Sequence, residues 1–373
     1  MLSLLAALTI GGLQEPAAKY IVLHEPAGKP PRLTLWVKNT RLEPSKKSPK
    51  LFGDPAIKWE FDWITSSFGP DEDAPKDPNT GEKQGRLRFR VYSQERKAED
   101  DKAEFIARQA IRMWDMVTSR FRFGHNETIN KGIVDFYVCW GGKAGGEQTL
   151  GEDLMPDNRS VKVNTIYLYD LRSFGSPVEM AREVAHEYGH AVLPAVGGYT
   201  SPEYWANGYL GEKVFMKWLR DEMARNVYGE RDAMGADLKQ MDAWVKTNVN
   251  PLVLAAASEP PNPVKLGDQG KIGMDAYIGL VLYADEIFDH QMVGRSLKLT
   301  GSQSAKDYPA ALLMAMEEKP KVTLGIPDYL KNKPLWIPLG KGSVAQAKIL
   351  KRSGDWAQIM PQTGAVVITT KRS

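Results

Sequence analysis

The residues of this chain best suited to chemistry are two histidines and a glutamate in the segment VAHEYGHAVLP, residues 184–194. His186 and His190 are four residues apart, so on a helix both imidazoles lie on one face and can reach one ion. Zn²⁺ binds neutral imidazole at about 2.0–2.1 Å and, with three protein ligands, keeps a position for water. Glu187, directly after His186, would take the proton of that water as a general base.

The segment around these residues carries the signals of a helix. Ser176 is a good N-cap, Pro177 suits the first helical position, and Glu179 completes a capping box. Pro194 and the glycine pair that follows it end the pattern, so the sequence predicts a helix over residues 177–193. The alternative is a helix that carries two histidines without a metal. Chance would place this motif in on the order of a few per thousand such chains, and two of the chain's five histidines fall here.

A zinc site of this kind needs a third protein ligand. No histidine follows His190 in the next 25 residues, which leaves Glu203 and Glu212 as candidates. Ser201-Pro202 is expected to begin the next helix, at residues 202–225, and the helix dipole alone explains a glutamate in its first turn. A ligand that faces the middle of the first helix should lie about two turns further on. The predicted ligand set is therefore His186, His190 and Glu212.

The run WANGYLGE, residues 205–212, resembles the second zinc-helix signature of the gluzincin metallopeptidases related to aminopeptidase N and leukotriene hydrolase. The resemblance rests on Trp205, Tyr209, Leu210 and Glu212, and it implies that Glu212 is a zinc ligand. In that family a later tyrosine stabilises the oxyanion, and Tyr277 occupies the comparable position.

Two further expectations come from comparison with that family. Tyr283 and His290 are alternatives to Tyr277 as the oxyanion donor. The Gly-x-Met-Glu-Asn strand that binds a free amine in the aminopeptidases is absent here, and residues 161–171 stand in the place of that edge strand. This favours an endopeptidase that holds an extended peptide by β-augmentation.

The expected fold is α+β and zincin-like, with a twisted mixed sheet, a backing helix and an active-site helix. A signal peptide is expected at residues 1–19 and a β-rich and α+β part at residues 20–175, of which residues 85–175 form the upper zincin subdomain. The active-site helix and a helical lower subdomain are expected at residues 176–320, and a small β unit at residues 321–373. Strands are expected in RLRFRVY, GIVDFYVCW and VKVNTIYLYDL, with GGKAGGEQTLG as a loop. Further helices are expected at residues 232–247, 274–298 and 304–317, and three short strands in SVAQAKIL, DWAQIM and AVVITT.

Composition excludes several classes of protein. Lys and Arg total 49 against 46 Asp and Glu, and no basic run is interleaved with aromatics, so no nucleic-acid partner is expected. Cys139 is the only cysteine, which excludes an intramolecular disulfide and a cysteine-based metal cluster. The apolar run of the first residues is too short to span a bilayer and predicts a signal peptide, hence a secreted, periplasmic or cell-envelope protein. A buried N-terminal strand is the alternative.

The sequence thus predicts a zinc-dependent metallopeptidase whose partner is a peptide or protein substrate, with Glu187 as general base. Two alternatives stay open. One is a catalytically silent, zincin-like secreted binding protein, although a purely structural zinc site would not need Glu187. The other is a zinc hydrolase that acts on an epoxide or an ester, because the metal and base chemistry would be shared. The sequence sets no oligomeric state.

Overall fold

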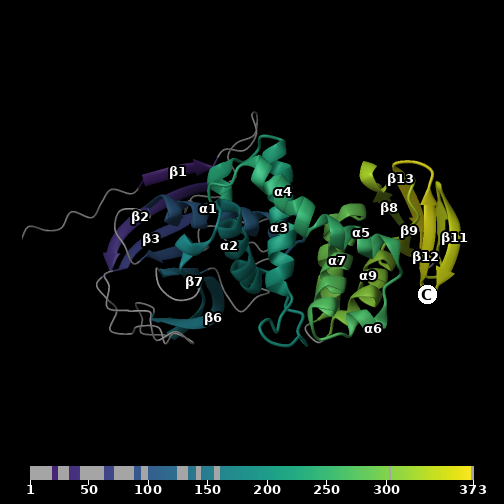
Figure 1. The fold of residues 1–373 in the computed structure, drawn as a ribbon, viewed down its shortest axis with the longest axis horizontal. Helices are drawn as coiled ribbons and strands as arrows, with labels where there is room; N and C mark the ends of the chain where they lie inside the picture. The colour runs from purple at the N-terminus through teal and green to yellow at the C-terminus, as the bar shows by residue number, and fades with distance from the viewer. Residues whose placement is uncertain are drawn as a thin grey trace, which may run out of the picture.

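The structure is a computed structural model, and it has an α+β architecture in three parts along its long axis (Figure 1). It describes residues 19–23, 33–42, 63–70, 88–93, 100–123, 133–139, 144–154, 160–301 and 304–370. A sheet with two helices against it comes first, a helical part follows, and a small β unit ends the chain. The expected signal peptide lies outside the described residues except for Lys19.

The first part is built on a seven-stranded mixed sheet of order β1-β2-β3-β4-β5-β7-β6. The strands are β1 (Lys19–Leu23), β2 (Leu33–Leu42), β3 (Trp63–Pro70), β4 (Arg88–Ser93), β5 (Ile133–Cys139), β6 (Gly145–Leu154) and β7 (Ser160–Tyr169). β4, β5 and β7 are parallel neighbours, and the remaining pairs are antiparallel. Parallel neighbours need a crossover, which α1 (Asp100–Ser119) supplies between β4 and β5.

The edge of this sheet differs from the expectation. The segment expected to be the edge strand, residues 161–171, forms most of β7, which lies second from the edge. Residues 145–151 of the segment expected to be a loop instead belong to β6, which pairs with β7 over its whole length from Gly145 to Leu154. Glycine weakens a strand intrinsically, but ten residues of ladder pairing outweigh that preference here.

Two helices bury one face of the sheet. The helical spacing of Ile106, Ala110, Met113 and Val117 places all four on the buried side of α1. α2 (Pro177–Val192) begins where the sequence predicts, because the Ser176 hydroxyl accepts a hydrogen bond from the Glu179 amide at 3.4 Å. Helix α2 is thus fixed against the sheet by its own cap and by the core.

The middle part is helical, with several boundaries that differ from those expected. Its helices are α3 (Asn207–Ala224), α4 (Leu238–Asn248), α5 (Asn250–Ser258), α6 (Pro263–Leu266), α7 (Lys271–Ile287), α8 (His290–Thr300) and α9 (Tyr308–Glu317). The helix expected at 274–298 is two helices, because Asp289 caps a new one by accepting from the Gln291 amide at 2.9 Å. Short 3-10 turns occur at Leu171–Ser173, Glu230–Ala233, Ala305–Asp307 and Asp328–Leu330.

The start of α3 matters most for the site. The proline at 202 predicts a helix from there, but α3 begins at Asn207. The Ala206 amide donates to the Val196 carbonyl at 2.9 Å, which closes residues 194–206 into a loop at the end of α2. Glu203 therefore lies in that loop instead of on a helix.

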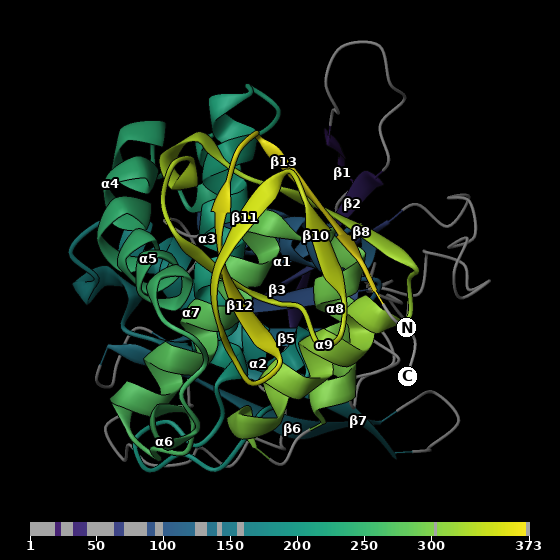
Figure 2. The ribbon, with the colours of Figure 1, turned by 90° about the vertical axis from the view of Figure 1, so that its right-hand side faces the viewer.

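The final part consists of two three-stranded antiparallel sheets, which face the viewer in Figure 2. Their strands are β8 (Lys321–Gly325), β9 (Leu335–Pro338), β10 (Ser343–Ala345), β11 (Ala347–Ser353), β12 (Trp356–Pro361) and β13 (Ala365–Thr369). The strands expected in DWAQIM and AVVITT are confirmed. SVAQAKIL is divided between two strands at Gln346, whose φ of 65° turns the chain from one sheet to the other.

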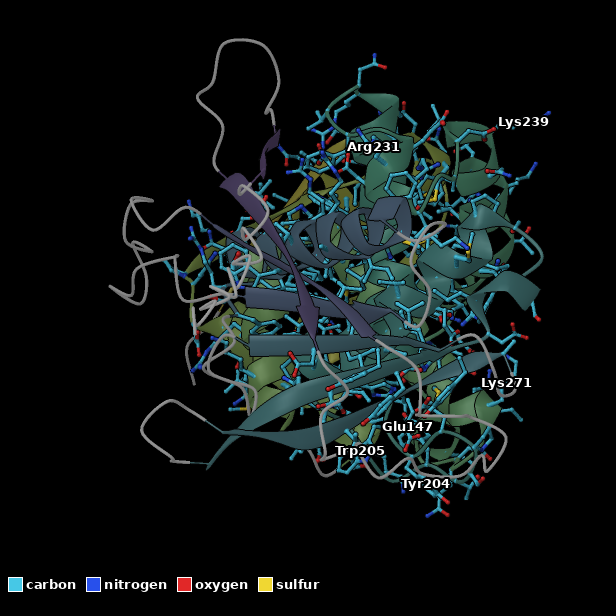
Figure 3. The ribbon with its side chains drawn as sticks, turned by 90° about the vertical axis from the view of Figure 1, so that its left-hand side faces the viewer. Glu147, Tyr204, Trp205, Arg231, Lys239 and Lys271 are labelled. Atoms are coloured by element: carbon cyan, nitrogen blue, oxygen red, sulfur yellow. The ribbon has the colours of Figure 1, made fainter. Side chains whose placement is uncertain are left out.

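None of the helices that the structure describes combines the length and the apolar character needed to cross a membrane. Seen from the opposite end of the molecule, the strands of the large sheet lie in front and the helical part lies behind them (Figure 3).

Helices α2 and α3 touch through their backbones. A Cβ atom on Gly211 of α3 would lie 2.6 Å from the Cα atom of Gly189 on α2, and one on Gly189 would lie 2.7 Å from the Asn207 carbonyl oxygen. The two helices can approach this closely only because neither residue has a side chain. This crossing brings the first turns of α3 against the histidines of α2.

We expect Gly211→Ala to destabilise the folded protein by about 1–3 kcal/mol, because the new methyl group would force two helix backbones apart. The urea midpoint of unfolding measures this loss. Gly175→Ala is the matched control, since a Cβ there would meet no atom within 4 Å. Equal midpoints for the two variants would show that the helix crossing tolerates a side chain.

Candidate metal centre

Helix α2 brings the predicted histidines and the predicted base to one buried place. His186 is 7% exposed and Glu187 is 4% exposed. The rings of His186 and His190 lie 5.1 Å apart and nearly perpendicular to each other, as expected for residues one helical turn apart.

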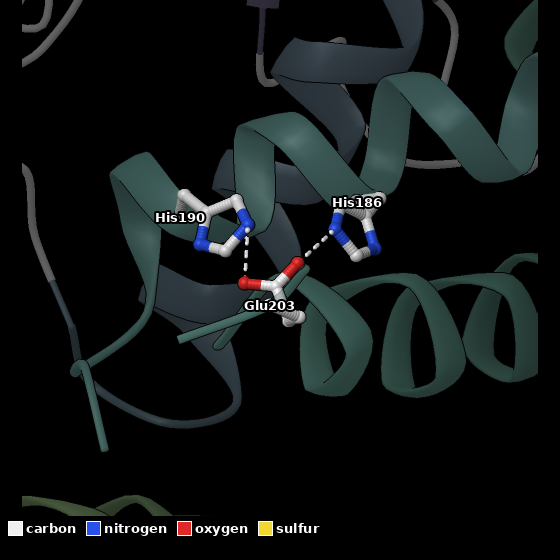
Figure 4. Close-up of side chains that lie close together, drawn as sticks. All are labelled: His186, His190 and Glu203. Atoms are coloured by element: carbon white, nitrogen blue, oxygen red, sulfur yellow. Dashed lines mark hydrogen bonds and ion pairs between the residues drawn. The ribbon is translucent and has the colours of Figure 1, made fainter. Parts of the chain in front are cut away.

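The third residue of this group is Glu203, from the loop between α2 and α3. Its Oε2 atom lies 3.0 Å from His186 Nε2, and its Oε1 atom lies 3.5 Å from His190 Nε2 (Figure 4). One ligand atom from each of the three residues falls within 4.8 Å of the others, so the group could hold one metal ion.

The backbone leaves room beside the two imidazole nitrogens. A Cβ atom on Gly208 would lie 2.7 Å from His186 Nε2 and would also clash with the His190 ring. Glycine at this position therefore keeps the space next to both Nε2 atoms free of side chain. Two imidazoles and one carboxylate are a donor set that suits Zn²⁺, so these residues fit the predicted metal.

Glu212, the predicted third ligand, contacts His186 from the other side of the ring. Its Oε2 atom lies 3.1 Å from His186 Nδ1, and its Oε1 atom accepts from Lys213 Nζ at 2.6 Å. Arg182 Nη1 also approaches Glu212 Oε2, at 3.3 Å. The structure therefore groups Glu203, and not Glu212, with the two Nε2 atoms. The physical reason is the late start of α3, which leaves Glu203 in a loop that folds back over α2.

Glu212 still acts on the centre through His186. A carboxylate that accepts from Nδ1–H fixes the imidazole tautomer and its orientation, which leaves the Nε2 lone pair for a metal. Asn207 orients the His190 ring in the same way, because its Oδ1 atom lies 2.8 Å from His190 Nδ1. The Asn207 amide also donates to the carbonyls of His190 and Leu193, at 3.1 and 3.3 Å.

Asn207 and Arg182 have no role in the site predicted from the sequence. Asn207 stands directly before Gly208 in WANGYLGE, and Arg182 lies one helical turn before His186. These positions were the available signals, but the partners of both side chains depend on the crossing of α2 and α3.

Tyr277, the predicted oxyanion donor, is not part of this group. It is fully buried, its ring packs edge-on against Tyr308 at 5.6 Å, and its hydroxyl has no hydrogen-bond partner among the described residues. Tyr283 is buried in the same way, and His290 pairs with Asp285 at 2.7 Å. The structure therefore does not support these three as donors to a substrate.

The tyrosine that does touch the centre is Tyr209. Its ring stands edge-on to His186 at 4.7 Å, and it is only partly buried. Tyr209 therefore lies closer to the candidate centre than the fully buried Tyr277.

The edge strand of the large sheet lies directly over Glu187. A Cβ atom on Gly146 of β6 would lie 2.7 Å from Glu187 Cδ. Glu187 is thus enclosed between α2 and the backbone of β6, and this enclosure explains its low exposure.

Burial and ion pairing shift the pKa values of the centre. Burial raises the pKa of Glu187 to about 7, although His186 and His190 act to lower it. Burial lowers the pKa of His186, but hydrogen bonds with Glu203 and Glu212 outweigh it and raise the value to about 10. Burial also opposes ionisation of Glu203 and Glu212, yet their contacts with His186 bring both pKa values to about 2.

These shifts place a positive charge between two carboxylates when no metal is bound. A divalent cation at the Nε2 atoms would take over the role of the His186 proton, because ligand histidines bind metals in their neutral form.

Neither the protein-family models nor the curated proteins contain a match for this chain.

The pKa shifts predict that the metal-free protein loses stability as the pH rises. The contribution of His186 is fully present below its ordinary value of 6.5 and is lost as the pH rises toward about 10. Glu187 acts in the same direction between 4.5 and about 7, because the folded protein then holds a proton that the unfolded chain has released. We expect the urea midpoint of chelator-treated protein to fall between about pH 5 and about pH 9.

Two comparisons check this explanation. Glu187→Gln should remove the part of the decline below about pH 7 and leave the rest. Saturation with Zn²⁺ should flatten the remaining decline, since the bound ion requires neutral His186. A midpoint that rises steadily over this pH range would contradict the assignment of charges.

Proposed function

We propose that this chain is a zinc-dependent metallopeptidase with a zincin-like fold, and that His186, His190 and Glu203 hold the metal. The observation that carries the proposal is the convergence of the two Nε2 atoms and the Glu203 carboxylate beside Gly208. The arrangement of the sheet supports it, because the antiparallel edge strand β6 lies over the helix that carries the His-Glu-x-x-His motif.

The proposed chemistry divides into what the metal supplies and what the chain does. Zn²⁺ at this site would supply Lewis acidity and lower the pKa of a water molecule toward about 7. Glu187 would accept a proton from the attacking water and pass it to the leaving nitrogen of the peptide. A carboxylate with a pKa of about 7 suits this exchange near neutral pH, and a nearby cation would lower that value.

The other residues of the centre would hold this geometry. Glu212 and Asn207 would orient the two imidazoles through their Nδ1 atoms. Tyr209, beside His186, would take the place that we first expected for Tyr277 as a donor to the oxyanion. Each of these roles depends on the first turns of α3 lying against α2.

Strand β6 would bind the substrate. Among the strands that the structure describes, β6 pairs only with β7, so an extended peptide can pair with its other side. Such pairing uses the peptide backbone and does not require a free terminal amine, which favours an endopeptidase. We retain secretion or a cell-envelope location as part of the proposal, on the apolar run at the N-terminus.

We expect the purified protein to bind one equivalent of zinc and to cleave members of a quenched peptide library. Glu187→Gln should keep the zinc and lose about 100-fold or more in kcat/KM, because a general base contributes about 10²–10⁴ in rate. If the wild type binds one equivalent of zinc but cleaves no peptide, the protein is the catalytically silent binding protein of the first alternative. Cleavage of an ester or an epoxide, but no peptide, would instead indicate the alternative hydrolase.

A second pair of variants separates the ligand from the residue that orients it. We expect Glu203→Gln to reduce zinc affinity more than Glu212→Gln, for which the loss should be about 10-fold to 100-fold. Competition with a chromophoric chelator measures both affinities. Glu259→Gln, at an exposed position far along the chain, is the control. The opposite order of losses would restore Glu212 as the metal ligand.

A further inference from the structure

Two exposed aromatic residues follow the proposed ligand Glu203 directly. Tyr204 is 57% exposed and Trp205 is 45% exposed. In the part of the chain that the structure describes, the one other large aromatic side chain classed as exposed is Tyr329, in the terminal β unit. An adjacent pair of exposed aromatic rings beside a metal ligand calls for an explanation, because such rings are normally covered by the fold or by a ligand.

Trp205 is held in place although it is exposed. Its backbone amide donates to Glu203 Oε1 at 3.4 Å. Its ring rests on the backbone of Gly197, where a Cβ atom would lie 2.7 Å from the ring carbon Cζ3. One side of the indole is therefore fixed against the protein, and a large part of the ring remains accessible.

The loop that carries both rings is anchored at two points. The Ala206 amide donates to the Val196 carbonyl at 2.9 Å, and the Thr200 amide donates to the Gln269 carbonyl at 2.8 Å. A ring on an anchored loop loses little freedom when a ligand covers it, which favours binding.

The position of the pair relates it to the edge strand. Figure 3 shows Tyr204 and Trp205 on the underside of the molecule, on the same side as Glu147 of β6. Gly146, the neighbour of Glu147, is the residue whose backbone covers the base Glu187. A peptide that lies along β6 at the metal centre would pass the loop that carries the two rings.

We propose that Tyr204 and Trp205 form a substrate subsite that binds an apolar or aromatic side chain of the peptide, next to the bond that is cleaved. This inference rests on the proposed peptidase function and adds the class of side chain that the enzyme selects. Aromatic faces bind apolar and aromatic groups through buried area and ring contacts. Because Glu203 would be bound to the metal, its charge is not available to select a basic side chain.

The test compares three variants on peptides that differ at one position near the cleaved bond. Tyr204→Ala and Trp205→Ala should each lower kcat/KM by about 10-fold to 100-fold for peptides with Phe, Trp or Leu at the selected position. For the matching peptide with Ala there, the change should be about 3-fold or less. Tyr329→Ala, which removes a ring that is 42% exposed from the β unit, should change neither value.

Zinc content and binding separate the possible failures. The zinc content of each variant shows whether the loss of the Trp205 ring has displaced Glu203. Tyr204→Ala repeats the test independently, because the ring nearest Gly197 is that of Trp205. The same peptides are also titrated by calorimetry into Glu187→Gln, with and without Tyr204→Ala. If the wild type cleaves no peptide but Phe peptides bind more tightly than Ala peptides and lose that preference with Tyr204, the peptidase proposal fails and the subsite stands.

Other outcomes overturn the subsite. The pair does not select apolar side chains if the variants lose kcat/KM equally on Phe and Ala peptides. The same conclusion holds if the wild type prefers Lys or Arg peptides and both Tyr204→Ala and Trp205→Ala remove that preference. Equal effects of Tyr329→Ala and Tyr204→Ala would show that exposure alone, and not position, explains the pair.

Discussion

The contact of two helix backbones at Gly189 and Gly211 is the constraint on which the rest of the centre depends. It allows α3 to cross α2 so closely that Gly208 borders both Nε2 atoms and Glu212 reaches the Nδ1 atom of His186. Helices that pack through side chains are usually 8–10 Å apart. A side chain at Gly189 or Gly211 would push the helices apart, so the absence of two side chains sets the geometry of the group.

Charge balance is the second condition. Three carboxylates, those of Glu187, Glu203 and Glu212, are gathered around two imidazoles in a largely buried place. Without compensation their mutual repulsion and desolvation would oppose folding. Arg182, Lys213 and the proton on His186 supply positive charge in the metal-free state. These positive charges balance the carboxylates without a bound ion, and a divalent cation at the Nε2 atoms would replace the His186 proton.

The sequence predicted those features that local patterns determine. The cap at Ser176, the face shared by His186 and His190, and the buried side of α1 follow from helical periodicity and capping, and the structure contains all three. The roles of residues whose partners lie on another element are harder to predict from the sequence. Glu203 was assigned to a helix because Pro202 is a start signal, but its carboxylate faces α2 from a loop. Strand β6 is not predicted because its glycines are typical of a loop, and its strand conformation depends on pairing with β7.

The enclosure of Glu187 by β6 has a consequence for the order in which the protein assembles. The histidines, Glu203, Glu212 and Arg182 all come from residues 182–212, so the entropy cost of bringing them together is that of short loops. On the proposed function, a metal could bind this local group before the sheet is complete. Glu187 acquires its buried environment only when Gly146 arrives from a different part of the chain. On the proposed function, metal binding and the shielding of the base would therefore be separate events, and a chain that has not yet placed β6 over α2 would carry zinc without a shielded base.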